Sequence, residues 1–214
     1  MLSRNYSLLD RFIHGLDQAL HVSVGPAGRP SRPSPAAHQT ESQLGVTERE
    51  LAGRLMRVNH AGEVCAQALY QGQAFTARQP TVRNKMQQAA IEENDHLAWT
   101  EGRIHEMGTH TSYLAPFWYA GSFALGALAG IAGDKWSLGF VAETEHQVIR
   151  HLDKHLALLP AQDTKSRAIL AQMRSDESHH ATAAEAAGGV PLPQTVRRLM
   201  AVIATTMTST TYWI

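Results

Sequence analysis

Two short segments decide the fold: IEENDH at residues 91–96 and SDESHH at residues 175–180. Each contains a glutamate followed three positions later by a histidine, Glu93 with His96 and Glu177 with His180. On an α-helix this spacing places the two side chains next to each other on one face. Both members of a pair can then bind the same metal ion, so the segments predict a metal centre between helices.

A lone glutamate precedes each pair at a similar distance. Glu63 lies 30 positions before Glu93, and Glu145 lies 32 positions before Glu177. In an antiparallel helical hairpin, about 12–13 residues, or roughly 19 Å, would lie on each side of the turn, so the two carboxylates would reach the same height. The 49 positions from His96 to Glu145 are too many for a tight hairpin. They predict a crossover connection along a bundle.

Helix start and stop signals divide the chain. A capping-box pattern at Thr47 and Glu50 predicts the first bundle helix. The expected helices are 47–77, 82–105, 116–159 as one continuous helix, 163–187 and 194–212. Residues 1–46 are expected to form an N-terminal amphipathic segment and, from residue 22, a flexible or extended Pro/Gly/Ser-rich linker. Alternating β patterns are absent from the sequence, so we predict an all-α fold, with a ferritin-like four-helix bundle over residues 47–214.

The chemistry of the predicted ligand side chains limits which metal ions could bind. Unpaired ionised carboxylates are strongly disfavoured in an apolar core, and two divalent cations would neutralise four of them. Mixed carboxylate and imidazole ligands suit iron or manganese better than calcium or structural zinc. The predicted ligands are Glu63, Glu93, His96, Glu145, Glu177 and His180.

Neighbouring side chains leave the register open in places. Glu92 precedes Glu93, Glu143 competes with Glu145, and Asp176 forms a second pair of the same spacing with His179. For several further residues a supporting role at the site and a plain surface or packing role are both open: Asp95, His60 and His151.

Composition excludes some classes of function. Basic and acidic residues each number 19, and the pI of about 7.2 gives no electrostatic reason to expect a nucleic-acid partner. The single cysteine, Cys65, excludes an internal disulfide framework and is expected to be a small core residue. A reducing, cytoplasm-facing compartment fits this cysteine content.

Four segments resemble the demethoxyubiquinol hydroxylase family of ubiquinone biosynthesis: LMRVNHAGEVCAQALYQGQ, EENDH, VAETEHQVIRHL and MRSDESHH. The similarity runs from about residue 51 to the C-terminus, and the N-terminal segment resembles only bacterial members. The resemblance places di-iron ligands on the six residues named above. VAETEH has a residue between its acids where some relatives have adjacent glutamates.

The resemblance implies an O2-dependent di-iron 3-demethoxyubiquinol 3-hydroxylase, a monooxygenase that hydroxylates the ring of a polyprenylated benzoquinol. Two ferrous ions are the implied cofactors. Reducing equivalents would come from outside the chain, through the quinol itself or from NADH, because no Gly-rich nucleotide-binding unit occurs in the sequence.

Two apolar regions suggest contact with lipid. Residues 114–133 carry no charge, and we expect a crossover helix buried in the bundle or dipping into one leaflet rather than a transmembrane span. The last helix begins with Arg197 and Arg198 and ends with Tyr212 and Trp213, a pattern that suits a helix on a bilayer surface. A structural terminal helix is the alternative. We expect a peripheral protein at the cytoplasmic face of the bacterial inner membrane, as a homo-oligomer or in a ubiquinone-biosynthesis complex.

Two other functions share parts of this pattern. A ferritin-like ferroxidase or peroxidase without an organic substrate would use the same ligand spacing. A membrane-bound helical scaffold would carry the acids and histidines on its surface and bind no stoichiometric metal. The apolar residues 114–133 favour the hydroxylase over the first alternative.

Overall fold

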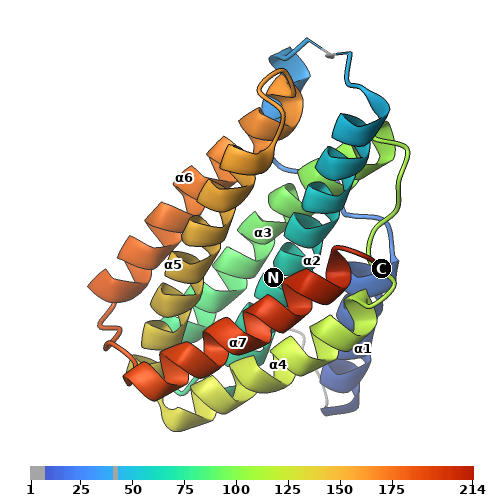
Figure 1. Ribbon diagram of the computed structural model, residues 1–214. Helices are drawn as coiled ribbons and strands as arrows, with labels where there is room; N and C mark the ends of the chain where they lie inside the picture. The colour runs from blue at the N-terminus through green and yellow to red at the C-terminus, as the bar shows by residue number, and fades with distance from the viewer. Residues whose placement is uncertain (1–7, 41–42) are drawn as a thin grey trace.

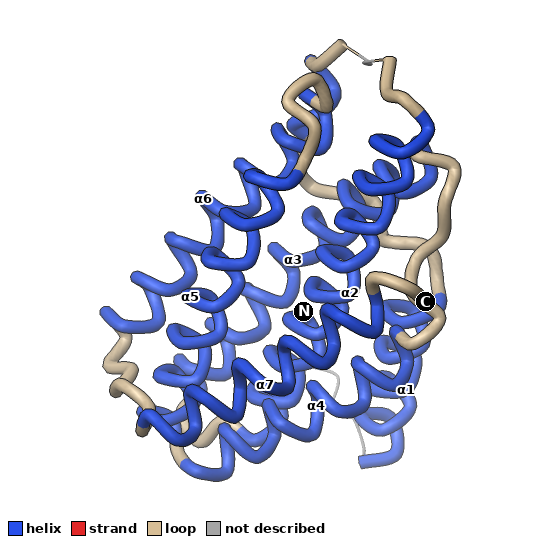
Figure 2. The backbone as a smooth tube through the Cα atoms, in the orientation of Figure 1, coloured by secondary structure: helices blue, strands red, loops and turns tan. Residues whose placement is uncertain are grey.

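The computed structural model describes residues 8–40 and 43–214, and within these ranges the regular structure is entirely helical (Figures 1 and 2). The all-α prediction is therefore confirmed. The elements are α1 (Leu8–Val24), the 3₁₀ turn η1 (Pro35–His38), α2 (Val46–Thr76), α3 (Pro80–Glu106), α4 (Ala115–Ala132), α5 (Asp134–Leu158), α6 (Thr164–Ala186) and α7 (Gln194–Thr211).

Helices α2, α3, α5 and α6 form a ferritin-like four-helix bundle built from two hairpins, α2–α3 and α5–α6 (Figure 1). The bundle has two apolar layers with polar side chains between them. One layer includes Met56, Leu152 and Met173, and the other includes Met86 and Val141. In each bundle helix the predicted ligands lie between the residues of these two layers, so the fold places them in the middle of the bundle.

The prediction of one continuous helix over residues 116–159 is wrong. The chain breaks at Gly133, whose φ of 114° is a conformation that side chains with a Cβ rarely adopt. Asp134 then begins α5, and its carboxylate accepts hydrogen bonds from the backbone N–H groups of Arg78 and Gln79. This contact ties the start of α5 to the α2–α3 turn, and the break lets α5 return along the bundle.

The crossover helix α4 lies on the outside of the bundle, against α2. Its expected burial in the bundle is therefore wrong, and the alternative, that it dips into one leaflet, stays a prediction. A Cβ added at Gly126 would lie 2.2 Å from the carbonyl oxygen of Leu69, and one at Gly72 would lie 2.2 Å from that of Phe123. The two helix backbones are therefore in direct contact. The rest of α4 is largely exposed, and it is the one helix of the described chain long and apolar enough to span a membrane.

The start of the bundle differs slightly from the prediction. Helix α2 begins at Val46, and its first turn is closed by Glu48, whose carboxylate accepts a hydrogen bond from the N–H of Gly45 at 2.9 Å. The capping pattern is therefore Gly45 with Glu48 rather than Thr47 with Glu50. The preceding residues, 25–40, contain little regular structure but are bonded to α3: the N–H of Ala27, for example, donates to Glu101 at 2.7 Å.

Candidate metal centre

The six predicted ligands converge in the interior of the bundle. Glu63 comes from α2, Glu145 from α5, and one Glu-x-x-His pair from each of α3 and α6. The four glutamates are at most 3% exposed, and His96 is fully buried. Their ligand atoms form two groups, each within 4.8 Å: Glu63, Glu93, His96 and Glu177, and then Glu145, Glu177 and His180. Glu177 belongs to both groups, so the site is one centre with two halves.

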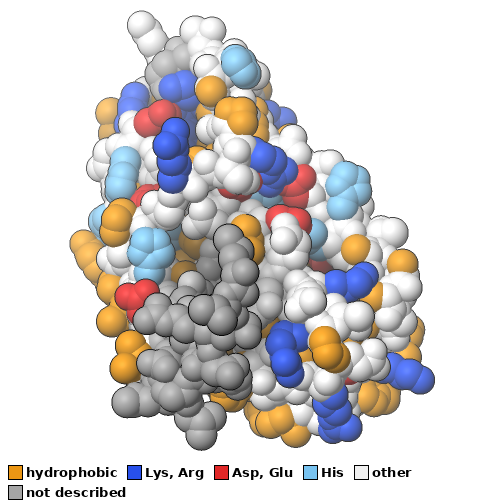
Figure 3. Space-filling view, turned by 180° about the vertical axis from the view of Figure 1, so that it is seen from behind, with side chains coloured by type: hydrophobic (Ala, Val, Ile, Leu, Met, Phe, Trp, Pro, Cys, Tyr) orange, Lys and Arg blue, Asp and Glu red, His pale blue; other side chains and the backbone are white. Residues whose placement is uncertain are grey.

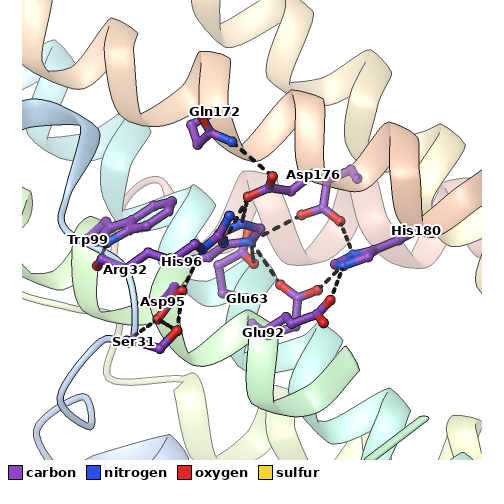
Figure 4. A network of polar contacts seen from close by, with 12 residues as sticks. Ser31, Arg32, Glu63, Glu92, Asp95, His96, Trp99, Gln172, Asp176 and His180 are labelled. Atoms are coloured by element: carbon purple, nitrogen blue, oxygen red, sulfur yellow. Dashed lines mark hydrogen bonds and ion pairs between the residues drawn. The ribbon is translucent and has the colours of Figure 1, made fainter. Parts of the chain in front are cut away.

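His96 directs Nδ1 into the centre (Figure 4). This nitrogen lies 3.0 Å from Glu93 Oε2, 3.3 Å from Glu177 Oε1 and 3.4 Å from Glu63 Oε2. His180 does the same from α6, with Nδ1 3.1 Å from Glu177 Oε2 and 3.3 Å from Glu93 Oε1. Each histidine thus faces carboxylate oxygens contributed by at least two helices, an arrangement that can hold a cation.

The outer nitrogen of each histidine is held by an acid from the opposite pair. Asp176 accepts from Nε2 of His96 at 2.9 Å, and Glu92 accepts from Nε2 of His180 at 2.9 Å. Both acids directly precede the glutamate of a Glu-x-x-His pair. In this structure these neighbouring acids contact the histidines from outside, which supports the predicted choice of Glu93 and Glu177 as ligands. His179, the possible partner of Asp176 by spacing, is exposed.

Glu145 contacts a residue that the sequence interpretation missed. The hydroxyl of Tyr70 donates a short hydrogen bond to Glu145 Oε1, and the Tyr70 ring lies edge-on to His180, with centroids 6.5 Å apart. Tyr70 follows Glu63 by seven positions, two helical turns, and therefore lies on the same face of α2. That spacing was the signal available in the sequence.

Glu143, the competitor of Glu145, is directed away from the centre. It accepts hydrogen bonds from Arg197 Nε at 2.7 Å and Gln147 Nε2 at 2.9 Å. This carboxylate therefore connects α5 to α7, and its placement supports Glu145 as the residue of VAETEH that faces the other ligands.

The remaining candidates have other contacts. Asp95 is buried and accepts from Ser31 and Arg32 of the N-terminal segment. His151 lies against His155, with ring centroids 3.9 Å apart, and His60 is buried with Nδ1 making no hydrogen bond. Cys65 is half-buried, and burial raises the pKa of its thiol to about 11.

Burial and the contacts between the acids and histidines shift the pKa values of several side chains at the centre. Burial, reinforced by Glu93 and Glu177, raises the pKa of Glu63 well above its usual value, although His96 opposes this. Burial and the same two carboxylates raise the pKa of Glu145 well above normal. Burial alone would lower the pKa of His180, but its hydrogen bonds to Glu177 and Glu93 raise it to about 12. Strong shifts in both directions within one buried group are typical of functional sites.

The fold and the cluster define a class: a ferritin-like helical protein with a buried carboxylate–histidine centre able to hold metal. The chain belongs to the family described as ubiquinone biosynthesis protein COQ7, whose model matches residues 50–211. The family resemblance of the four segments is therefore confirmed.

Curated relatives are similar over the whole chain. A protein of Nitrosococcus oceani is 58% identical over 214 residues, covering 100% of both chains. One from Acinetobacter baumannii is 56% identical over 211 residues, 99% of this chain and 100% of the relative. One from Stutzerimonas stutzeri is 56% identical over 209 residues, 98% and 97%. All three are named 3-demethoxyubiquinol 3-hydroxylase.

Proposed function

We propose that this protein is a di-iron monooxygenase that uses O2 to hydroxylate the ring of a polyprenylated demethoxybenzoquinol in ubiquinone biosynthesis. The observation that carries the proposal is the pair of ligand groups joined at Glu177, in a chain whose full-length relatives bear the name of this hydroxylase. The ligands would be Glu63, Glu93, His96, Glu145, Glu177 and His180.

The residues present fit two divalent cations. Glu63 Oε2 and Glu93 Oε1 are buried without a well-aligned hydrogen bond and face only the Nδ1 atoms of His96 and His180, 3.4 and 3.3 Å away. Burying carboxylate oxygens in this way is costly unless a cation neutralises them. Four ionised glutamates carry a charge of −4, which two divalent cations balance while the histidines stay neutral. The oxygen and imidazole donors suit iron. Ferrous ions bound here would supply the electrons and open coordination positions that O2 activation needs.

The surrounding residues prepare the ligands. Asp176 and Glu92 hold a proton on the outer Nε2 of His96 and His180, so that Nδ1 keeps its lone pair for metal. Tyr70 holds a proton toward Glu145. The apolar layers above and below the centre exclude bulk water, which protects a reactive oxidant from side reactions.

The isoprenoid substrate calls for a lipid-facing surface, and we place it on α4 and α7. Phe117 and Leu128 of α4 and Leu199 and Val202 of α7 are all at least 60% exposed. The helices are joined where Trp118 Nε1 donates to Thr211 Oγ1 at 3.1 Å. The opposite side of the molecule carries basic, acidic and histidine side chains among apolar ones (Figure 3). This surface would make the protein peripheral to the cytoplasmic face of the inner membrane.

The test is an assay with labelled oxygen. Protein purified in detergent is loaded with ferrous iron without oxygen, mixed with a short-chain demethoxyquinol, and exposed to oxygen-18-labelled O2. We expect a hydroxylated quinol carrying one labelled oxygen atom by mass spectrometry. Oxidation of the iron without a hydroxylated product would contradict the proposal and favour the ferroxidase alternative.

A further inference from the structure

The N-terminal segment contacts the metal centre through one side chain. Arg32 follows α1 and precedes η1, outside the residues 50–211 that the family model matches. Its guanidinium lies between the two hairpins, with Nε 2.7 Å from Asp95 Oδ2 on α3 and Nη2 2.9 Å from Asp176 Oδ2 on α6 (Figure 4). Arg32 therefore connects two helices whose histidines belong to opposite halves of the centre.

Asp176 carries the contact inward. The Oδ2 atom that accepts from Arg32 also accepts from Nε2 of His96 at 2.9 Å, while Gln172 Nε2 donates to Oδ1 at 2.9 Å. All three donors thus fix the Asp176 carboxylate in one orientation. We infer that Arg32 is a positioning residue of the proposed metal centre, holding Asp176 so that His96 keeps Nδ1 directed at the metal.

The geometry around Arg32 is suited to this role. Its guanidinium carbon lies 4.9 Å from the centroid of the Trp99 ring, and that ring packs against His96 at 5.5 Å between centroids. The Trp99 Nε1–H donates to the backbone carbonyl of Arg32 at 3.3 Å. Arg32 is thus held by an aromatic ring and two carboxylates, and a planar fork of donors can satisfy both carboxylates at once.

Asp95 serves as the anchor of the segment. Its side chain is only 2% exposed and accepts from the N–H of Ser31 at 2.6 Å as well as from Arg32. The Arg32 side chain itself is 41% exposed. The residue can therefore be substituted from the solvent side without opening a cavity in the bundle core.

The inference rests on the proposed metal centre. A measurement of metal binding distinguishes a failure of the inference from a failure of the proposed function. Ferrous ion is titrated anaerobically into wild type, Arg32→Gln, Arg32→Lys and Arg29→Gln. Arg29 is an exposed arginine of the same segment, three positions earlier, so its substitution removes the same charge away from the carboxylates. Thermal unfolding of each metal-free variant is measured in parallel, and the ligand-field spectrum of each Co²⁺-loaded variant reports the coordination geometry.

We expect Arg32→Gln to weaken ferrous binding about 10–100-fold, the usual effect of losing a partner that orients a ligating histidine, and to change the Co²⁺ spectrum. Arg32→Lys keeps the charge but not the fork, so it should fold like wild type and bind with intermediate affinity. Arg29→Gln should match wild type in all three measurements.

Two results would overturn the inference while leaving the proposed function in place. Binding curves and Co²⁺ spectra of Arg32→Gln and Arg32→Lys that match wild type would show a merely structural contact, even if the unfolding temperature fell. An equal loss of affinity in Arg29→Gln would show a general charge effect. A folded wild type that binds no ferrous ion would instead overturn the proposed function and this inference with it.

Discussion

Glu93 and Glu177 face each other between the two histidines, and each divides its two carboxylate oxygens between them. Glu93 places Oε2 3.0 Å from His96 and Oε1 3.3 Å from His180, while Glu177 places Oε1 3.3 Å from His96 and Oε2 3.1 Å from His180. Because both carboxylates reach both histidines, we propose that each would contribute ligand atoms to both halves of the metal centre. Glu63 and Glu145 lie at its two sides.

The register of α5 can be tested with two neighbouring glutamates. Glu145→Gln should lower the iron content and hydroxylation, because it replaces an anionic ligand with a neutral one. Glu143→Gln instead removes the negative charge that pairs with Arg197. It should keep its iron, and a loss of about 1 kcal/mol in stability would lower the melting temperature by about 2–4 °C. Elemental analysis and thermal unfolding measure both effects, and iron loss in Glu143→Gln alone would reverse the assignment.

Tyr70 should influence turnover through Glu145. Tyr70→Phe removes the hydroxyl that donates to Glu145, so we expect iron to remain while the hydroxylation rate falls about 10–100-fold. Tyr119→Phe is the matched control, because the Tyr119 hydroxyl donates to Gln71 rather than to the centre. Steady-state rates of both iron-loaded variants decide the matter. Equal rates for Tyr70→Phe and wild type would show that this hydrogen bond has no part in catalysis.

Because His60 is buried, its protonation is expected to destabilise the folded protein in acid. Burial, with a smaller contribution from His105, lowers the pKa of His60 to about 4 from an ordinary value of 6.5. The unfolded chain therefore binds a proton that the folded chain does not, and stability is lost as the pH falls from about 6.5 to 4, by up to about 1.4 kcal/mol per pH unit.

The difference between two proteins isolates this effect. Urea unfolding of the metal-free wild type and His60→Gln is compared at pH 7, 5.5 and 4.5. On acidification the free energy of unfolding should fall less in the variant than in wild type. The reason is that the wild-type chain takes up as much as one more proton than the variant when it unfolds. Parallel curves for the two proteins would mean that His60 titrates in the folded chain as it does in the unfolded one.

Membrane binding should depend on the outer surface of α7. We expect Leu199→Glu combined with Val202→Glu to reduce flotation with vesicles of phosphatidylethanolamine and phosphatidylglycerol, because both side chains are at least 60% exposed. Leu158→Glu is a control for one added charge on an exposed apolar residue elsewhere: this residue is 58% exposed at the end of α5, at the far end of the bundle from the start of α7 (Figure 1). Equal flotation of the double variant and wild type would show that α7 is not part of the lipid-binding surface.

Helical periodicity explains why the sequence alone could predict that the six ligand side chains lie close together. A spacing of three positions determines which residues share a helix face, and the roughly equal distances from Glu63 to Glu93 and from Glu145 to Glu177 place them at one height. The break at Gly133 could not be predicted in the same way. It depends on the close contact of α4 with α2 at Gly126 and on the bonds from Asp134 to the α2–α3 turn, which are tertiary contacts.

The sequence indicated only in part which acids contact the outer Nε2 atoms of the two histidines. Both segments read acid-Glu-x-x-His, with Asp176 and Glu92 in the first position, but their pairing across the bundle follows from the packing of α3 on α6. Arg32 carried no signal, since its partners lie more than 60 positions away and the segment around it has a linker-like composition. Such long-range contacts depend on the assembled fold.

The central claim is that Glu93 and its neighbours hold two iron ions, and metal content tests it most directly. Elemental analysis is performed on iron-supplied wild type, Glu93→Gln and Glu92→Gln. The adjacent Glu92 contacts His180 only from outside, so its variant controls for a lost charge at the same place on α3. The account predicts about two irons per chain in wild type, at most one in Glu93→Gln, and two more weakly held irons in Glu92→Gln. A folded wild type without iron, or a Glu93→Gln variant that retains both, would contradict it.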